Sequence, residues 1–128
     1  MQLDFEPNTR PTAISAYSER GIQIAGHWYT DHLLLTPGRV VTGWQACPVS
    51  ELTREHLTLL SAENPEVLIL GTGNAIRFPP QRLFADLAAN GVGLEVMDTR
   101  AACRTFNILL SEERAVAALL YLEIKASQ

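Results

Sequence analysis

The chain has 128 residues, of which 47% are hydrophobic and 19% are charged, and its formal net charge is −4. This length and composition predict a single globular domain over residues 1–128 and argue against a disordered chain. The negative charge argues against a nucleic-acid-binding protein, because neutralising phosphate groups requires a basic surface.

The two cysteines, Cys47 and Cys103, stand far apart and match no metal-binding or redox spacing. A disulfide between them stays open, but reduced thiols are the better expectation. The first residues are polar and unlike a signal or transit peptide. No apolar run reaches the roughly 20 residues of a membrane-spanning helix. We therefore expect a cytoplasmic protein without membrane insertion.

The N-terminal part of the chain has the pattern of short strands. Pro7 and Pro11 predict an extended arm over residues 1–12. Residues 13–46 follow as a β portion. Within it, residues 22–29 alternate between two faces and predict one strand. The two faces would carry Ile22, Ile24, Gly26 and Trp28, and Gln23, Ala25, His27 and Tyr29.

Two further short strands are predicted at residues 32–35 and 39–42, joined by a turn at Pro37-Gly38. Joined by turns, the strands of the β portion predict a β-meander or a small second sheet.

Residues 52–62 have the apolar spacing of a helix. Thr53 is the expected N-cap, and Leu52 and Leu57 have the spacing of a hydrophobic staple. We expect Leu57 and Leu60 to face the core. The Asn-Pro pair that follows ends the helix, because proline cannot extend it.

A strand–helix–strand unit follows. The apolar run at residues 67–70 predicts a central strand buried on both faces. A helix begins near Gln81, after two prolines, and ends where Gly91 is free to adopt a left-handed conformation. Its inner face would carry Leu83, Phe84, Leu87 and Ala88. Residues 93–97 form the second strand, parallel to the first, with a right-handed crossover.

A second helix is predicted from Asp98 or Thr99, one of which caps it, to about Leu110. Its inward side chains would be Ala102, Phe106, Leu109 and Leu110, and its outward ones Arg100, Arg104 and Asn107. A last apolar strand follows at residues 115–122. Residues 52–122 thus form an α/β core.

The candidate ligand site lies where the strands at residues 67–70 and 93–97 end, because open α/β sheets bind ligands beyond the carboxyl ends of their strands. This crevice gathers Gly71, Thr72, Gly73, Asn74, Asp98 and Thr99. The start of the second helix favours an anion there, whereas Asp98 would repel one and also fits a capping role. An anion or small-molecule site and a structural junction are both open interpretations. A nucleotide site is not favoured, because Ile76 stands at the third glycine position of the dinucleotide fingerprint.

No residues combine into a catalytic or metal-binding set. Cys103 lies near Arg100 and Arg104 and is either a reactive thiol or, more commonly for a free cysteine, a small buried hydrophobe. The histidines His27, His32 and His56 show no ligand spacing. We expect no catalytic residues, no metal and no cofactor.

Several segments resemble a known family. They are Gly71-Thr72-Gly73, the proline-started helix, the run Gly-Val-Gly-Leu-Glu-Val-Met-Asp-Thr-Arg-Ala-Ala-Cys-Arg-Thr-Phe-Asn at residues 91–107, and Arg114-Ala115-Val116-Ala117-Ala118. Over about residues 65–120 the chain is similar to a small uncharacterised domain family that includes the mitochondrial assembly factor three of NADH:ubiquinone oxidoreductase, respiratory complex I. Phe106 departs from the tyrosine of that family, and Glu113 departs from its glycine.

This resemblance implies an α/β fold in three layers, with a central mixed, partly parallel sheet flanked by helices and an N-terminal β-meander. It implies no established catalytic activity. The function expected is therefore that of a non-catalytic, assembly-factor-like protein that binds an unidentified protein partner. The outward residues Arg100, Arg104 and Asn107 are the candidate interaction face. The alternative is a small-molecule or anion binder, with or without enzymatic activity, that uses the crevice.

Overall fold

The structure, a computed structural model, describes residues 2–44 and 47–122, with the backbone alone at residues 59–62. In chain order the elements are β1 (Leu3–Asp4), β2 (Ile14–Ser18), β3 (Gly21–Ile24), β4 (His27–Tyr29), β5 (Leu33–Leu35), β6 (Val40–Val41), η1 (Val49–Glu51), η2 (Arg54–Glu63), β7 (Val67–Thr72), α1 (Gln81–Ala88), β8 (Gly93–Met97), α2 (Thr99–Ser111) and β9 (Val116–Tyr121).

The described strands form two sheets. The small sheet is antiparallel, with the order β1-β2-β3-β4, and is the predicted N-terminal meander. The large sheet has the order β6-β5-β9-β7-β8. In it β7 runs parallel to both β8 and β9, whereas β5 runs antiparallel to β9. The predicted mixed, partly parallel sheet is confirmed.

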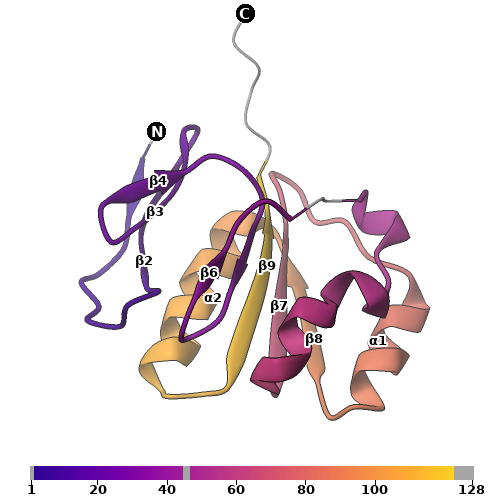
Figure 1. Cartoon of the computed structure of the whole chain (residues 1–128). Coiled ribbons are helices and arrows are strands. Elements are labelled where there is room, and N and C mark those ends of the chain that lie inside the picture. Colours follow the sequence, from indigo (N-terminus) through magenta and orange to yellow (C-terminus); the bar gives the residue numbers. More distant parts are fainter. Residues whose placement is uncertain (1, 45–46, 123–128) are drawn as a thin grey trace, which may run out of the picture.

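Three layers are visible in Figure 1, with α2 and the small sheet on one side of the large sheet and η2 and α1 on the other. The two layers that flank the large sheet correspond to two apolar clusters. Phe106 and Cys103 of α2 pack with Ile69 of β7, and Leu57 of η2 and Leu87 of α1 pack with the other face of the sheet. Consecutive residues of β7 point to opposite faces, so the strand is buried on both, as predicted.

The second helix begins and ends with recognisable caps. The Asp98 carboxylate accepts a hydrogen bond from the Ala101 N–H at 2.8 Å, which confirms Asp98 as the N-cap. After the helix, Glu113 has a φ of 60°. The position at which the family resemblance predicts glycine thus has the left-handed conformation that glycine adopts without strain. The Glu113 side chain lies 3.3 Å from the Arg10 guanidinium, so an ion pair to the N-terminal arm covers this turn.

The strand predicted over residues 22–29 is wrong, because two strands and a tight turn occupy these residues. Ala25 and Gly26 have φ values of 50° and 79°, as a type I′ hairpin turn requires at both central positions. Ile22 consequently pairs with Tyr29, and Gln23 pairs with Trp28. The period-two pattern continued through the turn and hid it.

The β portion predicted for residues 13–46 divides between the two sheets. Residues 14–29 belong to the small sheet, whereas β5 and β6 join the large sheet, where Leu34 pairs with Leu119 of β9. The three residues of β5 are fully buried, because Leu33 and Leu35 pack into one apolar cluster and Leu34 packs into the other.

Two details of the predicted helices also differ. The segment predicted as a helix at residues 52–62 is the 3₁₀ helix η2, beginning one residue after Thr53, with Leu52 and Leu57 buried as expected. The inward orientation expected for Leu60 lies outside the described side chains. In α1, Leu83 and Leu87 are buried and Phe84 is half-buried, but Ala88 is exposed because it lies past the edge of the packed stripe.

Candidate functional site

The structure brings together the six residues of the predicted crevice at the carboxyl ends of β7 and β8. The link is a backbone hydrogen bond in which the Thr99 N–H donates to the Gly73 carbonyl at 3.0 Å. Gly73 itself has a φ of 94°, which turns the chain away from β7. What the junction can bind therefore depends on which of its polar groups are still available.

Thr72 uses its hydroxyl to hold the loop that leaves β7. Its Oγ1 donates to the Ala75 carbonyl at 2.7 Å and accepts from the Arg77 N–H at 3.0 Å. The side chain of Arg77 folds back, and Nη1 donates to the Thr72 carbonyl at 2.8 Å. Thr72 is only 1% exposed, so these hydrogen bonds stabilise the loop from inside the protein and leave its hydroxyl out of reach of a ligand.

Thr99 makes the corresponding link between β7 and β9. Its Oγ1 accepts from the Gly73 N–H at 2.7 Å and donates to the Tyr121 carbonyl at 2.6 Å. The residue is fully buried at the start of α2. Both functions of the hydroxyl, donor and acceptor, are therefore used inside the protein.

Asp98 occupies the helix N-terminus that would otherwise attract an anion. The Asp98 carboxylate accepts a hydrogen bond from the Ala101 N–H, and the Asp98 backbone carbonyl accepts one from the Ala102 N–H at 2.9 Å. The carboxylate thus supplies the negative charge that favours this end of the helix dipole. Of the predicted ligand residues, Asn74 alone is exposed, and Asp98 is half-buried.

Gly71 is needed for packing rather than for a ligand. A Cβ atom at this position would lie 2.8 Å from the Ala102 Cβ, 3.0 Å from Leu120 Cδ2 and 3.0 Å from the Thr99 Cα. Helix α2 can approach β7 and β9 this closely because no side chain separates them.

The outward face predicted on α2 is only partly available. Arg100 and Arg104 are exposed. Asn107 instead turns to the small sheet, where its Oδ1 accepts from the Ile14 N–H and its Nδ2 donates to the Ile14 carbonyl, both at 2.8 Å. This amide pairs with β2 as a neighbouring strand would, and so ties α2 to the meander.

Replacing Asn107 with alanine is expected to lower the free energy of unfolding by about 1–2 kcal/mol, because the Ile14 N–H and carbonyl both lose their partner. Urea denaturation followed by circular dichroism measures the change. Asn90→Ala is the matched control, since the Asn90 side chain makes an exposed bond to the Asp86 carbonyl. Equal effects of the two substitutions would contradict a role for Asn107 in joining the layers.

Cys103 is a core thiol. It is fully buried, and burial, followed by the negative charge of Asp98, raises its pKa far above the ordinary value. A thiol held in the protonated form without solvent contact is a poor nucleophile. The neighbouring charges Arg100 and Arg104, both exposed, do not offset this burial.

Native-state alkylation distinguishes the two cysteines. Iodoacetamide is expected to modify Cys47, which is half-buried, and to leave Cys103 unmodified until denaturant is added. Intact-protein mass spectrometry over time measures the count of modified thiols. Modification of Cys103 at a rate comparable to Cys47 in native buffer would show that the helix opens readily.

Sequence reasoning missed a cysteine–histidine contact. Cys47 Sγ lies 3.7 Å from His56 Nδ1, although the two are nine positions apart in sequence and follow no known spacing. The same Nδ1 accepts a hydrogen bond from the Thr53 N–H at 3.0 Å. Thr53 Oγ1 also lies 3.0 Å from this nitrogen, so the Cys47 thiol shares Nδ1 with two groups of Thr53.

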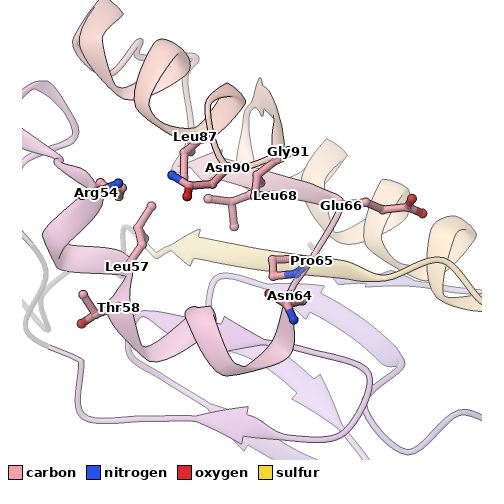
Figure 2. A pocket seen from close by; sticks show the side chains of 11 residues that line it. Arg54, Leu57, Thr58, Asn64, Pro65, Glu66, Leu68, Leu87, Asn90 and Gly91 are labelled. Atoms are coloured by element: carbon pink, nitrogen blue, oxygen red, sulfur yellow. The ribbon is translucent and has the colours of Figure 1, made fainter.

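A hollow of about 610 Å³ lies between η2 and α1, a size typical of ligand pockets. Figure 2 shows Arg54 and Leu57 on one side of it and Leu87 and Asn90 on the other, with Leu68 between them. The lining is mainly apolar. The residues that line this hollow come from several separate segments of the chain, so no sequence motif predicts the hollow.

A second hollow, of about 470 Å³, lies at the opposite end of β7, where Thr72 contributes to its wall. Beside it, Ile76 and Phe78 of the β7–α1 loop are large apolar side chains that are 55% and 67% exposed. This combination of a hollow and protruding apolar groups also escaped sequence reasoning, which treated the loop as a connection.

Within residues 2–44 and 47–122, no three His, Cys, Asp or Glu side chains lie close enough together to bind a metal ion. Across the same residues, no helix has the length and apolar character needed to span a membrane.

Comparison with known proteins identifies relatives along most of the chain. Over 111 residues it is 36% identical to the Danio rerio protein named NADH dehydrogenase (ubiquinone) 1 alpha subcomplex assembly factor 3. The match covers 85% of this chain and 63% of the relative, so the chain spans about six-tenths of that protein's length. The family resemblance found in the sequence is confirmed.

Solved structures show the same fold. A Xanthomonas campestris protein matches with a TM-score of 0.81 and 31% identity, over 91% of this chain and 88% of that one. A Bartonella henselae protein described as an outer membrane protein matches with a TM-score of 0.75 and 31% identity, over 88% of this chain and 96% of that one.

A family model described as "Protein of unknown function (DUF498/DUF598)" matches residues 14–121, which include both sheets apart from β1 and all the helices of the described structure. The chain therefore belongs to the DUF498/DUF598 family.

Proposed function

We propose that this chain is an assembly-factor-like protein that acts by binding another protein, without catalysis, in the cytoplasm. The observation that carries the proposal is the similarity to the Danio rerio assembly factor over 85% of the chain. The geometry of the crevice supports protein binding over ligand binding, because Thr72, Asp98 and Thr99 already form hydrogen bonds within the protein.

The alternative proposal is that the chain binds a small molecule or an anion in the crevice at the ends of the strands at residues 67–70 and 93–97. It has less support, since the helix N-terminus there already carries the Asp98 carboxylate. Isothermal titration with phosphate and with acetate tests it. Measurable binding that Asp98→Asn alters would favour this alternative over protein binding.

Arg100 and Arg104 are the part of the predicted interaction face that remains exposed, and we place the partner's acidic side chains against them. The test is affinity capture of the tagged full chain under mild lysis, followed by binding of the purified partner. Arg100→Glu/Arg104→Glu is expected to weaken that binding by about tenfold or more.

The matched control reverses the same number of charges on the other side of the large sheet, at the exposed residues Arg54 and Arg82. Arg54→Glu/Arg82→Glu is expected to leave partner binding unchanged. Absence of any reproducible partner would overturn the protein-binding proposal. Equal loss with both variants would overturn the placement of the interface on α2.

A further inference from the structure

The hollow between η2 and α1, here called the η2–α1 hollow, has the size and surface of a small-molecule site. Its volume is about 610 Å³, within the range of pockets that enclose most of a small ligand. Leu57, Leu68 and Leu87 line it and belong to one buried apolar cluster, and the half-buried Val92 packs against this cluster. The interior therefore favours the apolar body of a ligand.

The α1 wall of this hollow is held in one conformation by the way in which the helix ends. The Gly91 N–H donates to the Ala88 carbonyl and the Val92 N–H donates to the Leu87 carbonyl, both at 3.0 Å, while Gly91 has a φ of 77°. These are the two hydrogen bonds of a Schellman motif. A wall built in this way exists before a ligand binds, which lowers the cost of binding.

The hollow carries one positive charge that no acid of the protein balances. Arg54 is exposed and lines the hollow, and within residues 2–44 and 47–122 no carboxylate forms an ion pair with it. Hydrogen bonds from its own backbone and from the Thr53 side chain lower the pKa of the neighbouring Glu55, so that carboxylate is already held at the start of η2. Arg82 of α1 pairs with Asp86 at 3.5 Å. The hollow therefore offers a ligand a single cation.

The acid at the other end of the hollow does not compete for Arg54. Figure 2 shows Arg54 and Glu66 at opposite ends. The Arg114 Nε donates to Glu66 Oε1 at 2.7 Å, and this bond lowers the pKa of Glu66 and balances its charge. A guanidinium such as that of Arg54 can donate two parallel hydrogen bonds to a carboxylate. A phosphate ester, with a charge of about −2, would lack a second cation here.

We propose that the η2–α1 hollow binds an aliphatic carboxylate, with the carboxylate group against Arg54 and the hydrocarbon chain over Leu57, Leu68 and Leu87. This site is separate from the two proposed above. The interaction face lies on α2, on the other side of the large sheet from η2 and α1 (Figure 1). The crevice lies at the carboxyl ends of β7 and β8, whereas Val92 places the hollow near their amino ends.

Isothermal titration of the full chain with octanoate tests the proposal, because this probe carries both the charge and the hydrocarbon chain. Octanol, which has the chain without the charge, and acetate, which has the charge without the chain, are the matched ligands. Octanoate is expected to bind at least about tenfold more tightly than either of them. Amide NMR signals that shift most at Leu68, Leu87 and Val92 would locate the bound octanoate in the hollow.

Replacing Arg54 tests the charge. Arg54→Gln removes the cation and leaves the apolar walls, so it is expected to weaken octanoate binding about tenfold and to leave octanol binding unchanged. Arg82→Gln is the matched control, since Arg82 is exposed on α1 and does not line the hollow. This variant is expected to bind octanoate as the wild type does.

A bulky side chain tests the hollow itself. Asn90 is exposed and lines the hollow, so Asn90→Trp is expected to occupy the space and abolish binding of both octanoate and octanol. Ala89→Trp adds the same ring at the neighbouring exposed position, which does not line the hollow, and is expected to leave both affinities unchanged. Circular dichroism confirms the folding of each variant.

Octanoate that binds no more tightly than octanol overturns the pairing with Arg54, and octanoate that binds no more tightly than acetate overturns the apolar site. Equal effects of Arg54→Gln and Arg82→Gln, or of Asn90→Trp and Ala89→Trp, place the ligand elsewhere and overturn the proposal as well. Partner binding is measured separately. Arg54→Gln is expected to keep full affinity for the captured partner, so the ligand proposal and the partner proposal can each fail alone.

Discussion

Replacing Thr99 with valine is expected to lower the free energy of unfolding by about 2–4 kcal/mol, although the two side chains have nearly the same shape. The hydroxyl joins the Gly73 N–H to the Tyr121 carbonyl, at 2.7 and 2.6 Å, in a fully buried position. Valine would leave a buried donor and a buried acceptor without partners, at a cost of about 1–3 kcal/mol each. Urea denaturation of wild type and variant measures the difference.

Thr105→Val is the appropriate control for this substitution. Thr105 lies in the same helix and is half-buried. Unlike the Thr99 hydroxyl, the Thr105 hydroxyl makes no hydrogen bond to any residue in the described part of the chain. The control is expected to change stability by less than about 1 kcal/mol. A loss of this small size at Thr99 would mean that water replaces the missing hydroxyl and that the junction is open to solvent.

Gly71→Ala is expected to destabilise the protein by about 3 kcal/mol, at the upper end of the range for overpacked cores. The added methyl group would lie 2.8 Å from the Ala102 Cβ and 3.0 Å from the Thr99 Cα, so α2 must move away from the sheet. Gly38→Ala is the control, because a Cβ at Gly38 meets nothing within 4 Å.

A double substitution separates steric crowding from other effects of Gly71→Ala. Ala102→Gly removes one of the crowding atoms at the cost of a helical glycine, about 1 kcal/mol. The double variant is therefore expected to be more stable than the sum of the two single effects predicts, by about 1 kcal/mol. Strict additivity would contradict the steric account.

The elements predictable from sequence were those whose signals are local. The β7–α1–β8 unit follows from an apolar run, a proline-started helix and Gly91, whose φ of 77° is the left-handed conformation expected at the helix end. Asp98 lies at the N-cap for the same reason. The hairpin at Ala25-Gly26 was hidden, because alanine at a positive φ is not a turn signal and tertiary pairing enforces it.

The site was less predictable because its properties depend on distant neighbours. Helical periodicity correctly predicted that Asn107 points away from the large sheet. The small sheet lies on that side, however, and the Asn107 amide forms hydrogen bonds with the backbone of Ile14. In the same way, the residues of the crevice meet as predicted, yet Tyr121, 22 positions away from Thr99, takes the hydroxyl. Sequence gives the location of such groups, and packing decides their availability.

The central position of β9 also has a consequence for biosynthesis. This strand joins β5 to β7, and of the described elements it is translated after all the others. The small sheet, built from neighbouring hairpins, can form while the ribosome is still adding residues, because its contacts are local. The β5–β6 hairpin and the β7–β8 pair must wait until residues 116–121 emerge. A nascent chain that stalls before this point therefore exposes strand edges on both halves of an unfinished sheet, and such edges favour aggregation.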